Sequence, residues 1–109
     1  MFNGCIYLEY INFTNFNTSS VIDMSYMFEG CQFLESIDLS NFDTSNVISM
    51  EKMFKNCFSL KSLDLTSFRT PQLTTMDSMF SSCIELKYID LSTLDTSSVT
   101  SMESLFYYC

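Results

Sequence analysis

The fold is decided by residues 27–52, which read MFEGCQFLESIDLSNFDTSNVISMEK. The same pattern of residues recurs every 26 residues along a chain of 109 residues. Cysteine marks the period, at Cys5, Cys31, Cys57, Cys83 and Cys109. The repeating units are therefore residues 1–26, 27–52, 53–78 and 79–104, followed by a short remainder, 105–109.

Other residue types fall into equally regular columns. The clearest columns are Phe2, Phe28, Phe54, Phe80 and Phe106; Leu8, Leu34, Leu60 and Leu86; and Thr18, Thr44, Thr70 and Thr96. A single unit cannot bury so many apolar columns, but stacked units can, because each one covers its neighbour. The chain is therefore predicted to be one repeat domain, spanning residues 1–109.

The pattern within a unit predicts the fold class. Leu34-x-x-Ile37-x-Leu39 alternates apolar and polar residues as a strand does. Val21–Met24 is expected to be extended, Ser25–Gly30 to form one helical or 3₁₀ turn, and the Thr18 column to lie at a turn or at the start of a helix. The prediction is a β-rich, right-handed leucine-rich-repeat solenoid. It has a parallel sheet on one face and short strands, 3₁₀ or helical turns on the other.

The unit also resembles a known family. The stretch from Met27-Phe28 to Met50, with Asp38-Leu39-Ser40-Asn41-Phe42-Asp43-Thr44 at its centre, is similar to the BspA-like leucine-rich repeats, a mycoplasma-type lipoprotein or surface-protein repeat. The resemblance implies an adhesive protein on the cell surface or outside the cell.

Composition excludes several function classes. The chain has no His and a formal net charge of −8, which is the wrong sign for binding nucleic acid or an anionic membrane surface. No apolar run is long enough to span a membrane, and no signal peptide is visible. No His is present to act as a general base for the many Ser and Thr side chains. We therefore expect no catalytic residue and predict that the chain is not an enzyme. No cofactor is expected.

The cysteine column allows two interpretations. Stacking would place equivalent cysteines close enough for disulfides, and thiolates can bind metals. The spacing nevertheless fits no zinc pattern, and five cysteines leave one without a partner. We therefore expect Cys5, Cys31, Cys57, Cys83 and Cys109 to form a structural ladder of buried free thiols.

An acidic row is predicted on the outer surface of the strand. Asn12, Asp38, Asp64 and Asp90 lie between inward-facing residues, and stacking would set them about 5 Å apart. Such a row either binds Ca²⁺ through Asp38, Asp64 and Asp90 or forms a solvated strip with raised pKa values. A second row, Asn17, Asp43 and Asp95, is expected to cap turns.

Tyrosine and serine flank the acidic row. The predicted partner-binding residues are Tyr10, Asn12, Ser36, Asp38, Ser62, Asp64, Tyr88 and Asp90. A rival surface is the edge formed by Ile6, Tyr7, Phe33, Phe58 and Ile84, which we expect to be partly buried.

The sequence favours a non-catalytic protein-binding or adhesion module. The alternative is a structural unit that associates end to end into filaments, because the remainder Leu105-Phe106-Tyr107-Tyr108-Cys109 offers apolar surface. A protein partner, or self-association through the ends, follows from these two hypotheses.

Overall fold

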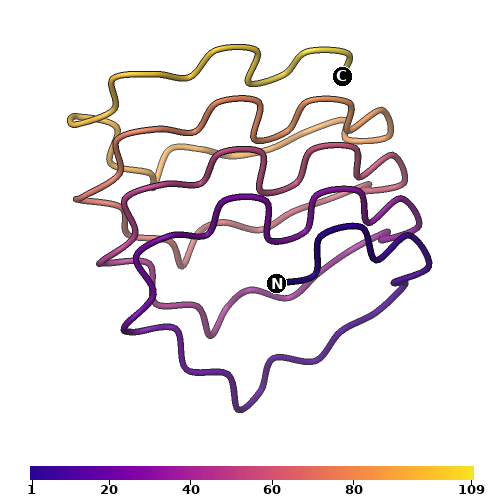
Figure 1. Cartoon of the computed structure of the whole chain (residues 1–109), viewed down its shortest axis with the longest axis horizontal. Helices are drawn as coiled ribbons and strands as arrows, with labels where there is room; N and C mark the ends of the chain where they lie inside the picture. The colour runs from indigo at the N-terminus through magenta and orange to yellow at the C-terminus, as the bar shows by residue number, and fades with distance from the viewer.

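The computed structural model describes all residues from 1 to 109. The chain runs around one core in four stacked passes, which we number 1 to 4 for residues 1–26, 27–52, 53–78 and 79–104. The remainder 105–109 starts a fifth pass (Figure 1). The molecule measures 32 × 32 × 21 Å, and its two ends lie at opposite ends of the stack (Figure 1).

One side of the stack is held by a backbone ladder that we call the turn ladder. The N–H of Met24 donates to the Ser49 carbonyl at 2.9 Å, and every second residue up to Gly30 donates to the next pass in the same way. The pattern repeats between all adjacent passes. Isolated parallel bridges therefore join Asp23 to Ser49, Ser49 to Thr75 and Thr75 to Ser101.

The ladder residues make tight turns and do not form a helix. The N–H of Met27 donates to the Met24 carbonyl at 3.3 Å and that of Cys31 to the Phe28 carbonyl at 3.1 Å. The third residues of these turns have positive φ, 61° at Tyr26 and 75° at Gly30, as in a type II turn. The helical or 3₁₀ turn predicted for Ser25–Gly30 is wrong, because a left-handed residue in every turn interrupts right-handed helical geometry.

The β-rich leucine-rich-repeat solenoid with a parallel sheet is also wrong. The structure contains no helix and no sheet, and its β content is limited to the four bridge residues Asp23, Ser49, Thr75 and Ser101. At Ile37–Leu39, where the sheet was expected, no backbone hydrogen bond joins adjacent passes; the nearest such bond runs from the Lys61 N–H to the Glu35 carbonyl. The alternation correctly places Ile37 and Leu39 inside and Asp38 outside, but alternation alone does not make strands pair.

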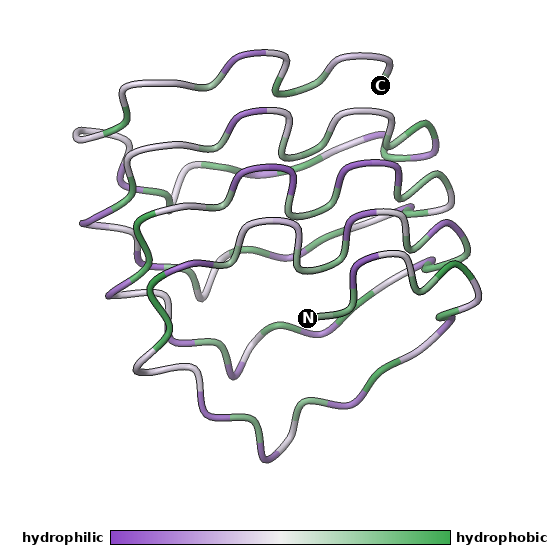
Figure 2. Ribbon diagram, in the orientation of Figure 1, coloured by the Kyte–Doolittle hydropathy of each residue, from purple (hydrophilic) through white to green (hydrophobic).

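The core consists of in-register columns of apolar side chains. Phe28, Phe54 and Phe80 are fully buried, and their rings stack with centroids 5.3 and 6.0 Å apart. Hydropathy repeats from pass to pass, with green hydrophobic segments at equivalent places (Figure 2). The buried set of 24 residues includes Leu34, Leu60, Met50, Met53 and Met76. Burial of these columns is the main stabilising contribution, since apolar burial contributes about 25 cal/mol per Å².

The threonine column joins the passes at a second corner. The Thr44 hydroxyl donates to the Arg69 carbonyl at 2.8 Å and accepts from the Arg69 N–H at 2.9 Å. Thr18 makes the same pair of bonds with Asp43. The Leu73 N–H donates to the Thr70 carbonyl at 3.1 Å, which closes a turn across Pro71. The predicted turn at this column is therefore confirmed.

Candidate functional site

The eight predicted partner-binding residues form what we call the tyrosine–acid face. All eight are exposed: Tyr10, Asn12, Ser36, Asp38, Ser62, Asp64, Tyr88 and Asp90. Tyr10 and Tyr88 are 73% and 76% exposed, respectively. Exposed tyrosines of this kind are favoured in protein interfaces. The arrangement leaves all of these side chains accessible, and partner binding stays a prediction.

The carboxylates of this face are held ionised by local hydrogen bonds. The Ser40 side chain and its N–H, which lies 2.9 Å from Asp38 Oδ1, keep the pKa of Asp38 below its usual range. Thr66 and Ser92 lower the pKa of Asp64 and Asp90 in the same way. The predicted rise in pKa is wrong, because these hydrogen bonds outweigh the repulsion that Asp38 and Asp90 exert on Asp64.

The acidic row does not assemble a cation-binding cage. No group of three or more His, Cys, Asp or Glu side chains lies close enough to hold a metal ion. Each Asp of the row instead accepts hydrogen bonds from the Ser or Thr two residues later, as in the 2.8 Å bond from the Thr66 N–H to Asp64. Asp38, Asp64 and Asp90 thus present separate charges to solvent.

The second polar row caps turns, as predicted. The N–H groups of Ser19, Ser45 and Ser97 donate to the side chains of Asn17, Asp43 and Asp95 at 3.0, 3.0 and 2.9 Å. Arg69 interrupts the row, and its guanidinium donates instead to the Thr66 and Phe68 carbonyls. These residues therefore have a structural role.

The cysteines form a hydrogen-bonded ladder. Cys57 and Cys83 are fully buried free thiols, and their Sγ atoms donate to the Phe28 and Phe54 carbonyls at 3.2 Å each. Burial raises the pKa of Cys83 to about 12 and that of Cys31 to about 11. Cys5 and Cys109, in the outermost passes, are exposed. The prediction of buried thiols is therefore confirmed for Cys31, Cys57 and Cys83 and is wrong for Cys5 and Cys109.

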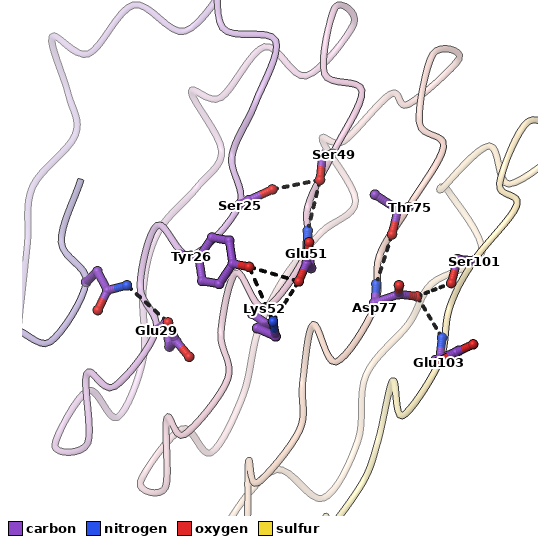
Figure 3. Close-up of polar contacts among 11 residues, drawn as sticks. Ser25, Tyr26, Glu29, Ser49, Glu51, Lys52, Thr75, Asp77, Ser101 and Glu103 are labelled. Atoms are coloured by element: carbon purple, nitrogen blue, oxygen red, sulfur yellow. Dashed lines mark hydrogen bonds and ion pairs between the residues drawn. The ribbon is translucent and has the colours of Figure 1, made fainter.

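The turn ladder carries a polar network that the sequence analysis missed. Lys52 Nζ lies 2.7 Å from Glu51 Oε1 and 5.0 Å from the centre of the Tyr26 ring in the preceding pass. The Ser101 hydroxyl and the Glu103 N–H both donate to Asp77 across passes (Figure 3). The signal available in the sequence was the column of Ser25, Glu51, Asp77 and Glu103.

The rival edge is mostly exposed. Tyr7 is 84% and Ile84 62% exposed, while Phe58 is half-buried. The Tyr7 and Phe33 rings stack with centroids 5.8 Å apart. A shallow hollow joins this edge to the tyrosine–acid face, and its lining is Glu9, Tyr10, Phe33, Glu35, Ser36 and Ser59.

Comparison with known protein families assigns the chain to one of them. A family model described as "Mycoplasma protein of unknown function, DUF285" matches residues 1–109. The chain belongs to the DUF285 family. The resemblance to BspA-like leucine-rich repeats is therefore wrong, since the whole chain matches DUF285. No curated protein and no solved structure matches this member of DUF285. No helix of the structure has the length and apolar character to cross a membrane.

Proposed function

We propose that the chain is a non-catalytic protein-binding module whose contact surface is the tyrosine–acid face. The observation that carries the proposal is the pairing of exposed Tyr10 and Tyr88 with a row of carboxylates whose pKa values are lowered. Tyrosine supplies rigid amphipathic contact area, and ionised carboxylates supply directional charge.

The charge of the module indicates the kind of partner. Its net charge of −8 favours association with a basic protein segment and speeds that association at low salt. The carboxylates already face solvent, so a partner need not open the fold to reach them. Display at the cell surface is part of the same proposal, and protease accessibility of the chain on intact cells tests it.

Binding of a basic peptide tests the module. A lysine- and tyrosine-containing peptide, titrated by calorimetry at low and at physiological salt, should bind the chain. The triple variant Asp38→Asn, Asp64→Asn and Asp90→Asn should weaken that binding at least tenfold. Asn keeps the oxygen that accepts the Ser and Thr bonds, so the fold should be retained.

A matched variant controls for net charge. Asp23→Asn, Glu29→Gln and Glu103→Gln remove three charges from the turn-ladder side of the stack. This variant should bind the peptide as the wild type does, apart from a small uniform loss. Equal weakening by both triple variants would show that only net charge matters and would reject the assignment to this face.

A second candidate function is end-to-end association. In the outermost passes, residues equivalent to the core are uncovered: Met1 is 80%, Met102 48% and Phe106 43% exposed, whereas Phe54 is fully buried. Unpaired donors of the turn ladder also face outward at one end, because the N–H groups of Met102 and Ser104 have no backbone acceptor. Surfaces of this kind favour stacking of further copies.

Sedimentation over a range of concentrations tests this candidate. End-to-end association predicts species that keep growing with concentration, and Phe106→Lys with Tyr107→Lys should abolish that growth. Growth that persists in the double variant would reject the end surface as the site of assembly.

A further inference from the structure

One exposed column reverses its charge halfway along the stack. It runs Glu9, Glu35, Lys61 and Lys87 from pass 1 to pass 4, and all four side chains are exposed. The Lys61 N–H donates to the Glu35 carbonyl at 3.0 Å, and the two side chains form an ion pair of 2.8 Å. We call these four residues the charge-reversing column. It carries two negative charges at one end and two positive charges at the other.

One neighbouring column reads the same in both directions. On one side stand Tyr10, Ser36, Ser62 and Tyr88, with tyrosine in both outer passes. Toward the edge, the column Ile6, Gln32, Phe58 and Ile84 has isoleucine at both ends, and these two side chains are 40% and 62% exposed. The column beside it, Tyr7, Phe33, Ser59 and Glu85, is not symmetric. Rotation of a second copy by a half-turn would therefore match like with like in the column from Tyr10 to Tyr88, which we call the tyrosine column, and at Ile6 and Ile84. It would match opposite charge with opposite charge in the charge-reversing column.

The same region holds much of the uncovered apolar surface of the molecule. Six of its large side chains are 40% exposed or more: Ile6, Tyr7, Tyr10, Phe33, Ile84 and Tyr88. Contiguous exposed apolar surface bordered by charge is typical of a protein–protein contact. The order of charges along the charge-reversing column then indicates which protein fits this surface.

We propose that this surface binds a second copy of the chain, with the two stacks antiparallel about a two-fold axis. Glu9 then faces Lys87 of the second copy, and Glu35 faces Lys61 of the second copy. Each of these pairs occurs twice because the contact is symmetric. Tyr10 meets Tyr88 of the second copy, and Ile6 meets Ile84 of the second copy.

The hollow beside the column is suited to receive the lysines of the second copy. Its lining contains the carboxylates of Glu9 and Glu35 and the rings of Tyr10 and Phe33. The chain already shows how a lysine uses such groups, since Lys52 lies over the Tyr26 ring and contacts Glu51. Attraction between an ammonium group and an aromatic face adds to the ion pair.

The ion pair within one chain does not prevent this exchange. The Lys61 and Glu35 side chains are 57% and 62% exposed, respectively, and exposed pairs of this kind contribute little to stability. Their charges can therefore be shared with a second copy.

The acidic row limits how far the contact extends. Beyond the tyrosine column, Asp38 would face Asp64 of the second copy, and like charges repel. The contact therefore ends at the tyrosine column, and the dimer displays two acidic rows. The inference rests on the proposed function in assigning the tyrosine column to a protein contact: in the dimer this column contacts the second copy, and the acidic rows stay free for a basic partner.

Exchange of charges between two variants tests the dimer. Glu9→Lys with Glu35→Lys makes the column uniformly positive, and Lys61→Glu with Lys87→Glu makes it uniformly negative. In sedimentation equilibrium at low salt, the wild type should form a dimer and no larger species. Each variant alone should dissociate at least tenfold more readily, and an equimolar mixture of the two should recover the dimer.

A control and the opposing outcomes complete the experiment. Glu29→Lys with Glu103→Lys makes the same charge change on the turn-ladder side and should leave the dimer intact. A wild type that stays monomeric at all concentrations, or a mixture that fails to associate, would overturn the proposal. Loss of peptide binding in the Asp38, Asp64 and Asp90 variant is measured separately, so either proposal can fail without the other.

Discussion

Replacement of Thr44 by valine should destabilise the chain by removing two hydrogen bonds between passes. The Thr44 side chain is buried, and its hydroxyl serves both the N–H and the carbonyl of Arg69, at 2.9 and 2.8 Å. Valine has nearly the same shape but leaves both groups without a partner. A net hydrogen bond contributes about 1 kcal/mol and an unsatisfied buried group costs more, so we expect a loss of about 2–3 kcal/mol.

Serine at the same position separates hydrogen bonding from packing. Thr44→Ser keeps both bonds and removes one methyl group, which costs about 1 kcal/mol. Thr96, its counterpart in pass 4, is exposed and makes no side-chain bond to another pass, so Thr96→Val should change stability by less than about 0.5 kcal/mol. Free energies of unfolding from urea titrations measure all three. A valine variant at least as stable as the serine variant would refute the reasoning.

Three further predictions follow from the turns, the carboxylates and the thiols. Ser78 has a φ of 54°, so Ser78→Gly should stabilise the chain by about 0.5–1 kcal/mol in urea titrations, while Ser78→Ala should give no gain. Hydrogen bonds lower the folded pKa of Asp38, Asp64 and Asp90. The contribution of these carboxylates to the free energy of unfolding is therefore complete above the unfolded pKa of about 3.9. It is lost as the pH falls through their lower pKa values in the folded state. Unfolding free energies at pH 7, 5 and 3 should be similar at the first two and lower at pH 3, and the Asn triple variant should show a smaller drop. Burial raises the pKa of Cys83 to about 12, so at pH 8 a thiol reagent followed by peptide mass mapping should label Cys5 quickly and Cys57 and Cys83 only after unfolding. Equal labelling of all three cysteines would contradict the buried ladder.

The burial pattern was predictable because equivalent residues occupy equivalent places. A column such as Phe28, Phe54 and Phe80 shares one environment in every pass, so its apolar character alone indicates the inside. The turn at the Thr70 column was predictable for a local reason, since Pro71 needs no hydrogen bond to its backbone nitrogen. The capping of turns by Asp43 and Asp95 followed from the same local chemistry.

The acidic row shows where pattern reasoning failed. Stacking of Asp38, Asp64 and Asp90 suggested mutual repulsion and raised pKa values. Each carboxylate instead accepts bonds from a Ser or Thr two residues later. The motif Asp-x-Ser/Thr was visible in the sequence, but the relative strength of the two effects depends on orientation, which the sequence does not give.

By itself, the sequence determined the 26-residue period, the inward columns and the local turns, because each depends on residue type and near neighbours. Only the tertiary structure decided which side of the stack pairs through its backbone. It also placed left-handed residues at Tyr26 and Gly30, where a helical turn was predicted. Backbone pairing depends on the distance between passes, which every packed side chain sets together. The period already placed Glu9, Glu35, Lys61 and Lys87 in one column, but only the structure showed that all four side chains are exposed and that Glu35 and Lys61 form an ion pair.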